Sequence, residues 1–237
     1  MLRAVLFDWG DTLMRWDPDP ELLADGHRAG LAAIGRQPVA GLTERFRDAY
    51  ISTWFEPGVV EEIEYPAQVR RLLGEFGVEV ADDELLRFLD AEHAAWAPAR
   101  QLASTTHALL ETLRERGLLL GLVSNAIDPP DLLHRDLAGF GIAERLDVAV
   151  FSSEVGRRKP DQLIFDRTLD RLGVAAAETL FVGDTLATDI AGATALGLHT
   201  CQALWFHADE DPAVPEPEFR AFTQMDVVSI VKRLQAQ

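Results

Sequence analysis

Cysteine and long apolar runs are scarce in this sequence of 237 residues. The single cysteine, Cys201, excludes an internal disulfide and is typical of proteins from a reducing cytosol. The longest apolar run, at residues 117–123, is far shorter than the roughly 20 residues of a membrane-spanning helix. The opening residues also lack the apolar length of a signal peptide. We therefore expect a cytoplasmic protein without a membrane partner.

Basic residues are scarce as well: there are 22 against 39 acidic residues, which gives a formal net charge of −17. A surface of that sign repels phosphodiester backbones, so nucleic acid is excluded as a main partner. Among the basic residues only Lys159 and Lys232 are lysines. In a chain this rich in arginine, a lysine indicates a position where a compact ammonium fits and a planar guanidinium does not. Lys159, between a predicted strand and a predicted helix, is the candidate.

The sequence does contain short, continuous apolar runs, and apolar residues make up 48% of it. Such runs, separated by helix-sized segments, are typical of a parallel sheet covered on both faces. The strands are expected at residues 4–7, 118–123, 148–151, 180–182 and 198–204. Segments with helical apolar spacing are found at residues 132–140, 163–172, 187–196 and 225–234. The sequence thus predicts an α/β, doubly wound parallel sheet.

Residues 17–98 follow a different pattern, because they contain no strand-like run and their apolar spacing is helical throughout. The four helices are expected at residues 21–34, 42–54, 66–76 and 83–96, with glycine and proline between them. We predict an inserted all-helical domain at 17–98 and an α/β core made of 1–16 and 99–237. Residues 207–218, acidic and rich in proline, are expected to form a surface loop.

Polar residues follow the predicted strands at their carboxyl ends. Asp8 follows the first run, Ser124 and Asn125 follow the second, and Asp184 closes the fourth. Lys159 lies a few residues beyond the third run. Because ligands of open parallel sheets bind outside the carboxyl ends of the strands, we expect these side chains to share one site.

Carboxylates that share one rim repel each other unless a proton or a cation separates them. Hard oxygen ligands favour Mg²⁺, which proteins usually bind through one or two carboxylates together with substrate phosphate. The metal and Lys159 would together neutralise a bound phosphate. That is the setting for phosphoryl transfer, where catalysis consists of positioning and charge stabilisation.

Four motifs in order carry a family resemblance. They are Phe7–Leu13 (FDWGDTL), Val123–Asn125 (VSN), Arg158–Asp161 (RKPD) and Gly183–Asp189 (GDTLATD). In sequence order and strand context they resemble the motifs of the haloacid dehalogenase-like (HAD) hydrolase superfamily, whose core is Rossmann-like. The helical insertion directly after the first motif resembles the C1-type cap domain of subfamily I. The resemblance covers nearly the whole chain.

The resemblance implies a role for each matching residue. Asp8 would be the nucleophile that attacks phosphorus and forms an aspartyl-phosphate, which water then hydrolyses. Ser124 and the backbone N–H of Asn125 would hold the phosphoryl oxygens. Lys159 would bridge Asp8 and the phosphate. Asp184, together with Asp8, would ligate Mg²⁺.

Asp189 would support the ion or its waters, and the backbone carbonyl of Gly10 would complete the metal contacts. Gly10 is also where this sequence departs from the family pattern, because phosphatases of the family usually carry there the Asp that protonates the leaving oxygen. Asp11, one residue later, is the candidate substitute for that general acid and base. Asp11 is equally interpretable as a turn residue.

Three functions remain open. The leading one is a Mg²⁺-dependent phosphatase acting on a small phosphorylated metabolite, since a cap closing over the cleft would exclude polymers. The second is hydrolysis of a carbon–halogen bond, motivated by Gly10 but opposed by the metal-binding form of the fourth motif, Asp184 with Asp189. The third is a phosphate-ligand binding module without turnover. The sequence leaves open the substrate, the cap residues that contact it, and the choice between monomer and homodimer.

Overall fold

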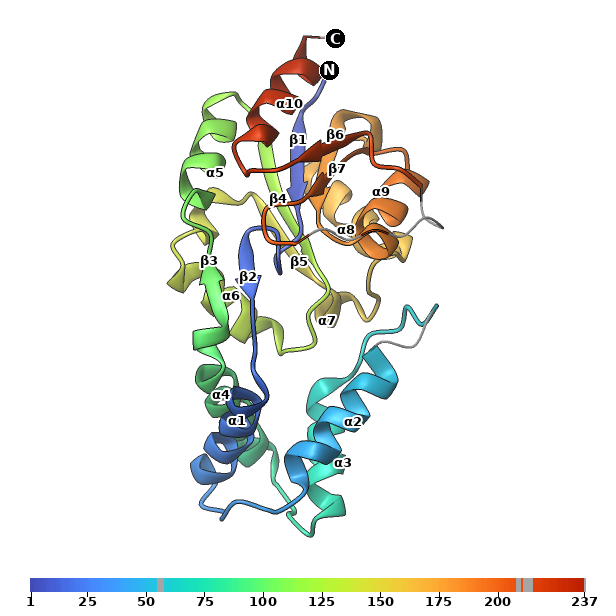
Figure 1. Cartoon of the computed structure of the whole chain (residues 1–237). Helices are drawn as coiled ribbons and strands as arrows, with labels where there is room; N and C mark the ends of the chain where they lie inside the picture. The colour runs from blue at the N-terminus through green and yellow to red at the C-terminus, as the bar shows by residue number, and fades with distance from the viewer. Residues whose placement is uncertain (55–57, 208–209, 211–214, 237) are drawn as a thin grey trace.

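The molecule has two lobes (Figure 1). The computed structural model describes residues 1–54, 58–207, 210 and 215–236. One lobe contains the large sheet and both chain ends, and the other consists of four helices from the first half of the chain. Among the described residues, none of the helices combines the length and the apolar character needed to cross a bilayer.

Six parallel strands form the large sheet, in the order β5-β4-β1-β6-β7-β8. They are β1 (Ala4–Phe7), β4 (Leu119–Ser124), β5 (Val148–Phe151), β6 (Thr179–Gly183), β7 (His199–Ala203) and β8 (Phe219–Ala221). The predicted α/β fold is confirmed, and its five expected strands are all present. The sixth, β8, was not predicted, because its three residues include Arg220 and form no apolar run.

Helices cover both faces of this sheet. On one face lie α5 (Thr106–Glu115), α6 (Pro130–Gly139) and α10 (Asp226–Gln235), which share a buried apolar core with the strands. On the other lie α8 (Gln162–Leu172) and α9 (Ala191–Ala195), with α7 (Ser152–Val155) directly after β5. The start and end of α8 follow from local chemistry, since Asp161 caps its first turn and Gly173 ends it in the left-handed conformation.

The second lobe contains α1 (Pro20–Ala33), α2 (Leu42–Trp54), α3 (Tyr65–Glu75) and α4 (Asp82–Ala95), as the apolar spacing of this segment predicts. These helices bury an apolar core of their own. Gly30 in α1 makes close packing possible, because a Cβ there would lie 2.7 Å from the ring of Phe88 in α4. The exact domain bounds at residues 17 and 98 stay a prediction.

Two strands connect the lobes. β2 (Met14–Trp16) pairs antiparallel with β3 (Arg100–Leu102), so the chain leaves and re-enters the core lobe side by side (Figure 1). This pair was not predicted, because each strand has only three residues. A second link joins Val60–Glu62 to Gly156–Arg158, through Glu62 N–H to Gly156 O (3.1 Å) and Arg158 N–H to Val60 O (2.9 Å).

A buried ionic network also ties the helical lobe to the core. The His93 ring, 1% exposed, lies 2.7 Å from Asp128 Oδ1 through Nδ1 and 2.9 Å from Asp136 Oδ2 through Nε2. Arg100 contacts Asp136 Oδ2 at 3.2 Å. Burial alone would lower the pKa of His93, but the two carboxylates outweigh it and raise that pKa above its ordinary value.

Candidate active site

Three carboxylates meet at the carboxyl edge of the sheet. Asp8 directly follows β1 and Asp184 directly follows β6, the neighbouring strand. Asp189 comes from the turn after β6. Each offers one oxygen to a cluster whose atoms lie within 4.8 Å of one another, and the three residues are 8%, 6% and 1% exposed. The structure therefore brings together the three aspartates that the sequence analysis singled out.

Lys159 lies inside this cluster. Its Nζ is 2.6 Å from Asp8 Oδ1 and 2.6 Å from Asp189 Oδ1, and the residue is 2% exposed. Asn125 holds the lysine backbone in place, because its Oδ1 accepts from Lys159 N–H at 2.7 Å and its Nδ2 donates to Lys159 O at 3.1 Å. The side chain of Asn125 thus joins the second and third motifs, a contact that sequence reasoning missed.

The electrostatics of the cluster follow from burial and crowding. Burial, reinforced by Asp189 and Asp8, raises the pKa of Asp184 to about 8. Burial raises the pKa of Asp189 to about 6, although Lys159 opposes the shift. Burial alone would lower the pKa of Lys159, but the attraction of Asp189 and Asp8 outweighs it and holds that pKa above its usual range. Three carboxylates with one ammonium leave an excess of negative charge that a cation would neutralise.

The fourth motif places Asp189 through an unusual turn. Residues Leu186–Ile190 form a single π-helical turn before α9, where the sequence predicted an ordinary helix at 187–196. Asp189 Oδ2 accepts from Thr185 N–H at 3.1 Å. Gly183 is required here, because a Cβ at that position would lie 2.4 Å from Asp189 Oδ2.

The loop after Asp8 contains the departure from the family pattern. Asp11 has a φ of +53°, a conformation that favours glycine, and its Oδ1 accepts from Trp16 N–H at 3.2 Å. This hydrogen bond spans five residues and holds the side chain to the last residue of β2, and the role of Asp11 as an acid stays a prediction. A Cβ at Gly10 would meet no heavy atom within 4 Å, so the position has room for a side chain.

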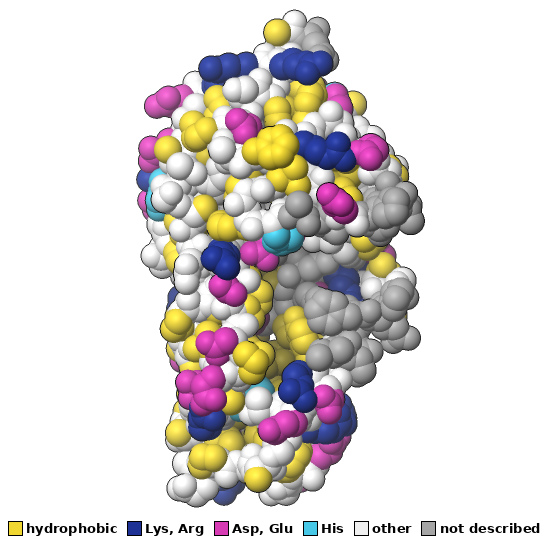
Figure 2. Space-filling model, viewed as in Figure 1, with side chains coloured by type: hydrophobic (Ala, Val, Ile, Leu, Met, Phe, Trp, Pro, Cys, Tyr) yellow, Lys and Arg dark blue, Asp and Glu magenta, His cyan; other side chains and the backbone are white. Residues whose placement is uncertain are grey.

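Ser124 is the last residue of β4 and is 3% exposed. Since β4 pairs with β1 in parallel, Ser124 lies at the same edge of the sheet as Asp8. The surface between the two lobes is hollowed on the face drawn in Figure 2. The predicted loop at 207–218 lies in part outside the described residues.

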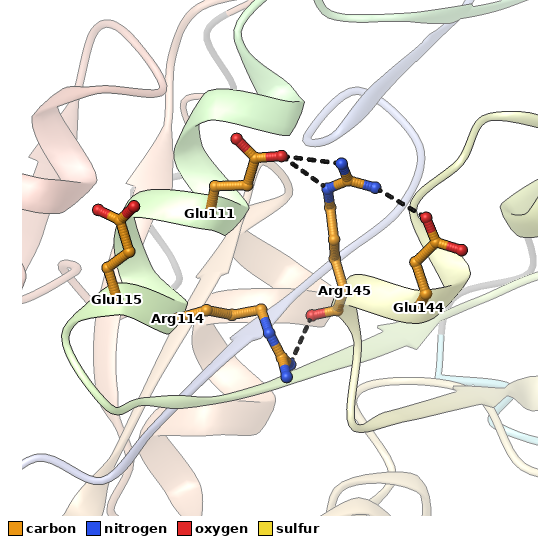
Figure 3. Close-up of a pocket in the computed structure, with 5 residues that line it drawn as sticks. All are labelled: Glu111, Arg114, Glu115, Glu144 and Arg145. Carbon is orange, nitrogen blue, oxygen red and sulfur yellow. Dashed lines mark hydrogen bonds and ion pairs between the residues drawn. The ribbon is translucent and has the colours of Figure 1, made fainter.

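Another hollow lies elsewhere on the molecule (Figure 3). Its lining residues are Glu111, Arg114, Glu115, Glu144 and Arg145. They precede β4 and β5, at the opposite edge of the sheet from the aspartates. Arg145 pairs with Glu111 and with Glu144, its Nη2 at 2.8 Å from Glu111 Oε1. Arg114 pairs with Asp147. This hollow is separate from the carboxylate cluster.

Sequence reasoning missed one side chain at the cluster. His207 Nε2 lies 3.0 Å from Asp184 Oδ2, and the imidazole is 47% exposed. The sequence carried no signal for it, because the six histidines form no pair with the spacing of metal ligands on a helix.

Comparison with known proteins gives the family. The model of the haloacid dehalogenase-like hydrolases matches residues 2–197. The chain belongs to this family. As a HAD-like hydrolase it is an enzyme, and the resemblance drawn from the four motifs is confirmed. The C1 type of its helical insertion stays a prediction.

Among the relatives of this HAD-like hydrolase is the phosphoserine phosphatase of Thermus thermophilus, 28% identical over 92% of this chain and 95% of that protein. Two solved structures share its fold. The 2-haloacid dehalogenase from Pseudomonas syringae has a TM-score of 0.70 at 23% identity, covering 98% of this chain and 99% of that one. YfnB from Bacillus subtilis, bound to magnesium, has a TM-score of 0.67 at 22% identity, covering 97% and 98%.

Proposed function

We propose that this HAD-like hydrolase is a Mg²⁺-dependent phosphatase that hydrolyses a small phosphorylated metabolite through an aspartyl-phosphate. One observation carries the proposal: Lys159 is ion-paired with Asp8 and Asp189 beside Asp184, at the carboxyl edge of a parallel sheet. The phosphatase relative that matches this chain over nearly its full length supports the reaction class.

The donor set fits Mg²⁺. Carboxylate and carbonyl oxygens are the ligands that this ion prefers. Burial raises the pKa of Asp184 and the neighbouring Asp189 and Asp8 raise it further, and a cation would relieve the repulsion from these two carboxylates. We assign Asp8, Asp184 and the carbonyl of Gly10 as ligands, with Asp189 supporting the ion or its waters. When bound, Mg²⁺ would supply positive charge to the phosphoryl oxygens and to the carboxylates.

Each residue of the site would then have a separate role in the reaction. The Asp8 carboxylate attacks phosphorus, a phosphorus–oxygen bond forms, and the bond to the leaving oxygen breaks. Lys159, the hydroxyl of Ser124 and the backbone N–H of Asn125 hold the phosphoryl oxygens while charge moves among them. The leaving oxygen takes its proton from Asp11. Water activated by the same carboxylate then attacks phosphorus, releasing phosphate and restoring Asp8.

The cap, residues 17–98, would limit the substrate to a small molecule. Its segment Val60–Glu62 is hydrogen-bonded to Gly156–Arg158, next to Lys159, so the helical lobe meets the core close to the reacting groups. A polymer could not enter beneath such a contact. The aspartate cluster with its ammonium favours phosphoryl transfer over carbon–halogen hydrolysis. The dehalogenases of this family need no metal for that reaction.

The proposal is tested by the release of inorganic phosphate from a panel of sugar phosphates, phosphorylated amino acids and nucleotides. We expect turnover with Mg²⁺ and a fall of at least about 10²-fold with EDTA, since Asp8, Asp184 and a phosphate dianion cannot crowd together unscreened. Excess Mg²⁺ should restore the rate. Chloride release from haloacids in metal-free buffer would contradict the proposal, and ligand binding without turnover would favour a binding module.

The role of Asp11 as general acid predicts a dependence on the leaving group. Asp11→Asn should slow hydrolysis of an alkyl phosphate by about 10²-fold and that of p-nitrophenyl phosphate much less, because an alkoxide needs protonation and p-nitrophenolate does not. The Trp16 hydrogen bond engages only Oδ1 of Asp11, which leaves Oδ2 to carry the proton. Steady-state rates of the parent and the variant on both substrates show whether Asp11 is the general acid.

Equal and small effects on the two substrates would assign Asp11 to the turn alone. The control is the double change Gly10→Asp with Asp11→Gly, which the backbone admits because Gly10 has space and residue 11 has a positive φ. If Asp11 is the acid, this swap should leave alkyl phosphate hydrolysis within about tenfold of the parent rate. A large acceleration confined to the alkyl phosphate would show that the parent lacks an acid.

A further inference from the structure

A histidine outside the four motifs reaches the carboxylate cluster along an anchored path. After β7 ends at Ala203, the backbone N–H of Leu204 donates to Ala221 O at 2.9 Å, which ties the chain to β8. The indole Nε1 of Trp205 then donates to Thr12 O at 2.8 Å, which ties it to the loop after the first strand. His207 follows two residues later, so the chain just before it is tied both to β8 and to the loop that carries the first motif.

The imidazole contacts one particular oxygen. His207 Nε2 lies 3.0 Å from Asp184 Oδ2, and the hydroxyl of Thr185 donates to the same oxygen at 3.1 Å. Two contacts on one oxygen fix the rotation of the carboxylate about its last side-chain bond. Both contacts go to Oδ2, so Oδ1 of Asp184 is the oxygen that neither of them engages.

When Asp184 binds a cation, the chemistry of the His207–Asp184 pair determines which group donates the hydrogen bond. A carboxylate that binds a cation can only accept hydrogen bonds, so Nε2 of His207 must carry the hydrogen. The Asp184 side chain is 7% exposed and has little access to water, so the imidazole supplies a donor that solvent cannot readily replace.

We infer that His207 is a positioning residue, which orients the Asp184 carboxylate for the divalent cation through Nε2. The inference rests on the proposed function, because it assumes that Asp184 is a metal ligand. It assigns to His207 no contact with the substrate and no proton transfer. Removing a residue that hydrogen-bonds to a metal ligand typically lowers metal affinity by about 10- to 100-fold.

The test measures Mg²⁺ binding to the full chain by calorimetry, without substrate. His207→Ala should weaken Mg²⁺ binding about 10- to 100-fold. His207→Gln, whose amide N–H can donate from a similar reach, should recover most of the loss. The matched control is His199→Ala, since His199 at the start of β7 pairs with Glu218 at 2.6 Å and should bind Mg²⁺ like the parent. With saturating Mg²⁺, kcat of His207→Ala should return to within a few-fold of the parent value.

Equal Mg²⁺ affinity of the His207→Ala and His199→Ala variants would overturn the inference, as would a Gln variant as weak as the Ala variant. So would a kcat that stays low at saturating Mg²⁺ while the affinity is unchanged. Asp184→Asn separates this failure from that of the proposed function. If Asp184→Asn loses Mg²⁺ and His207→Ala does not, only the positioning role fails. If Asp184→Asn binds Mg²⁺ like the parent, the metal site itself is wrong.

Discussion

The Asp8→Asn variant is expected to lose turnover by at least about 10⁴-fold while it keeps its fold. An amide has the shape of a carboxylate but is a poor nucleophile, so the first covalent step fails. Asp8 follows β1 and its backbone N–H donates to Val182 O at 2.9 Å, a bond that the substitution leaves intact. Phosphate release under saturating Mg²⁺ measures the loss, and thermal unfolding checks the fold.

The matched control for this variant is Asp17→Asn, an exposed aspartate that pairs with Arg15 at 2.9 Å beside the β2–β3 connection. Its rate should equal that of the parent. An Asp8→Asn enzyme that retains more than a few per cent of the parent activity would show that another group attacks phosphorus. Acid quenching during turnover should trap labelled phosphate on the parent chain and none on the variant.

Lys159→Arg should be nearly as damaging as Lys159→Met, with kcat/KM lower by about 10³-fold in both. The ammonium lies 2.6 Å from two carboxylates in a site that leaves the residue 2% exposed. A guanidinium is larger and planar, and it cannot place one compact positive centre between Asp8, Asp189 and a phosphoryl oxygen. Steady-state kinetics on the best substrate of the panel measures both variants.

Lys232 provides the control for these variants, because it is the other lysine of the chain and is exposed on α10. Lys232→Arg and Lys232→Met should both leave kcat/KM unchanged. A Lys159→Arg enzyme with nearly the parent rate would mean that charge alone matters at this position. Unfolding temperatures of all four variants separate a loss of chemistry from a loss of structure.

Much of the architecture was predictable from the sequence because it depends on patterns along the chain. Continuous apolar runs such as Ala4–Phe7 have to be buried on both faces, and the residue that ends each run has to lie at the edge of the sheet. This reasoning places Asp8 and Asp184 at the same edge of the sheet, whereas their position on neighbouring strands comes from the structure. It fails for β2, β3 and β8, where three residues are too few to carry a pattern.

The features that were not predictable depend on the path of the chain in space. Lys159 was expected to bridge Asp8 and a phosphate, and nothing in the sequence indicated that Asp189 would contact the same ammonium. His207 reaches Asp184 because the chain after β7 is tied down at Leu204 and Trp205, just before it. The direction of the Asp11 side chain depends on the positive φ of this residue. The sequence did not indicate that φ, because an aspartate stands where the family usually has glycine.

The pairing of Val60–Glu62 with Gly156–Arg158 has a consequence for how often the cleft is accessible. Two backbone hydrogen bonds, each with a net contribution of about 1 kcal/mol, would hold these two segments together by about 2 kcal/mol. At 1.4 kcal/mol for each factor of ten, the form with these contacts would outnumber a form without them by about 30 to one. A minority of about 3% without this pairing would give small molecules access at this edge of the cap by thermal motion.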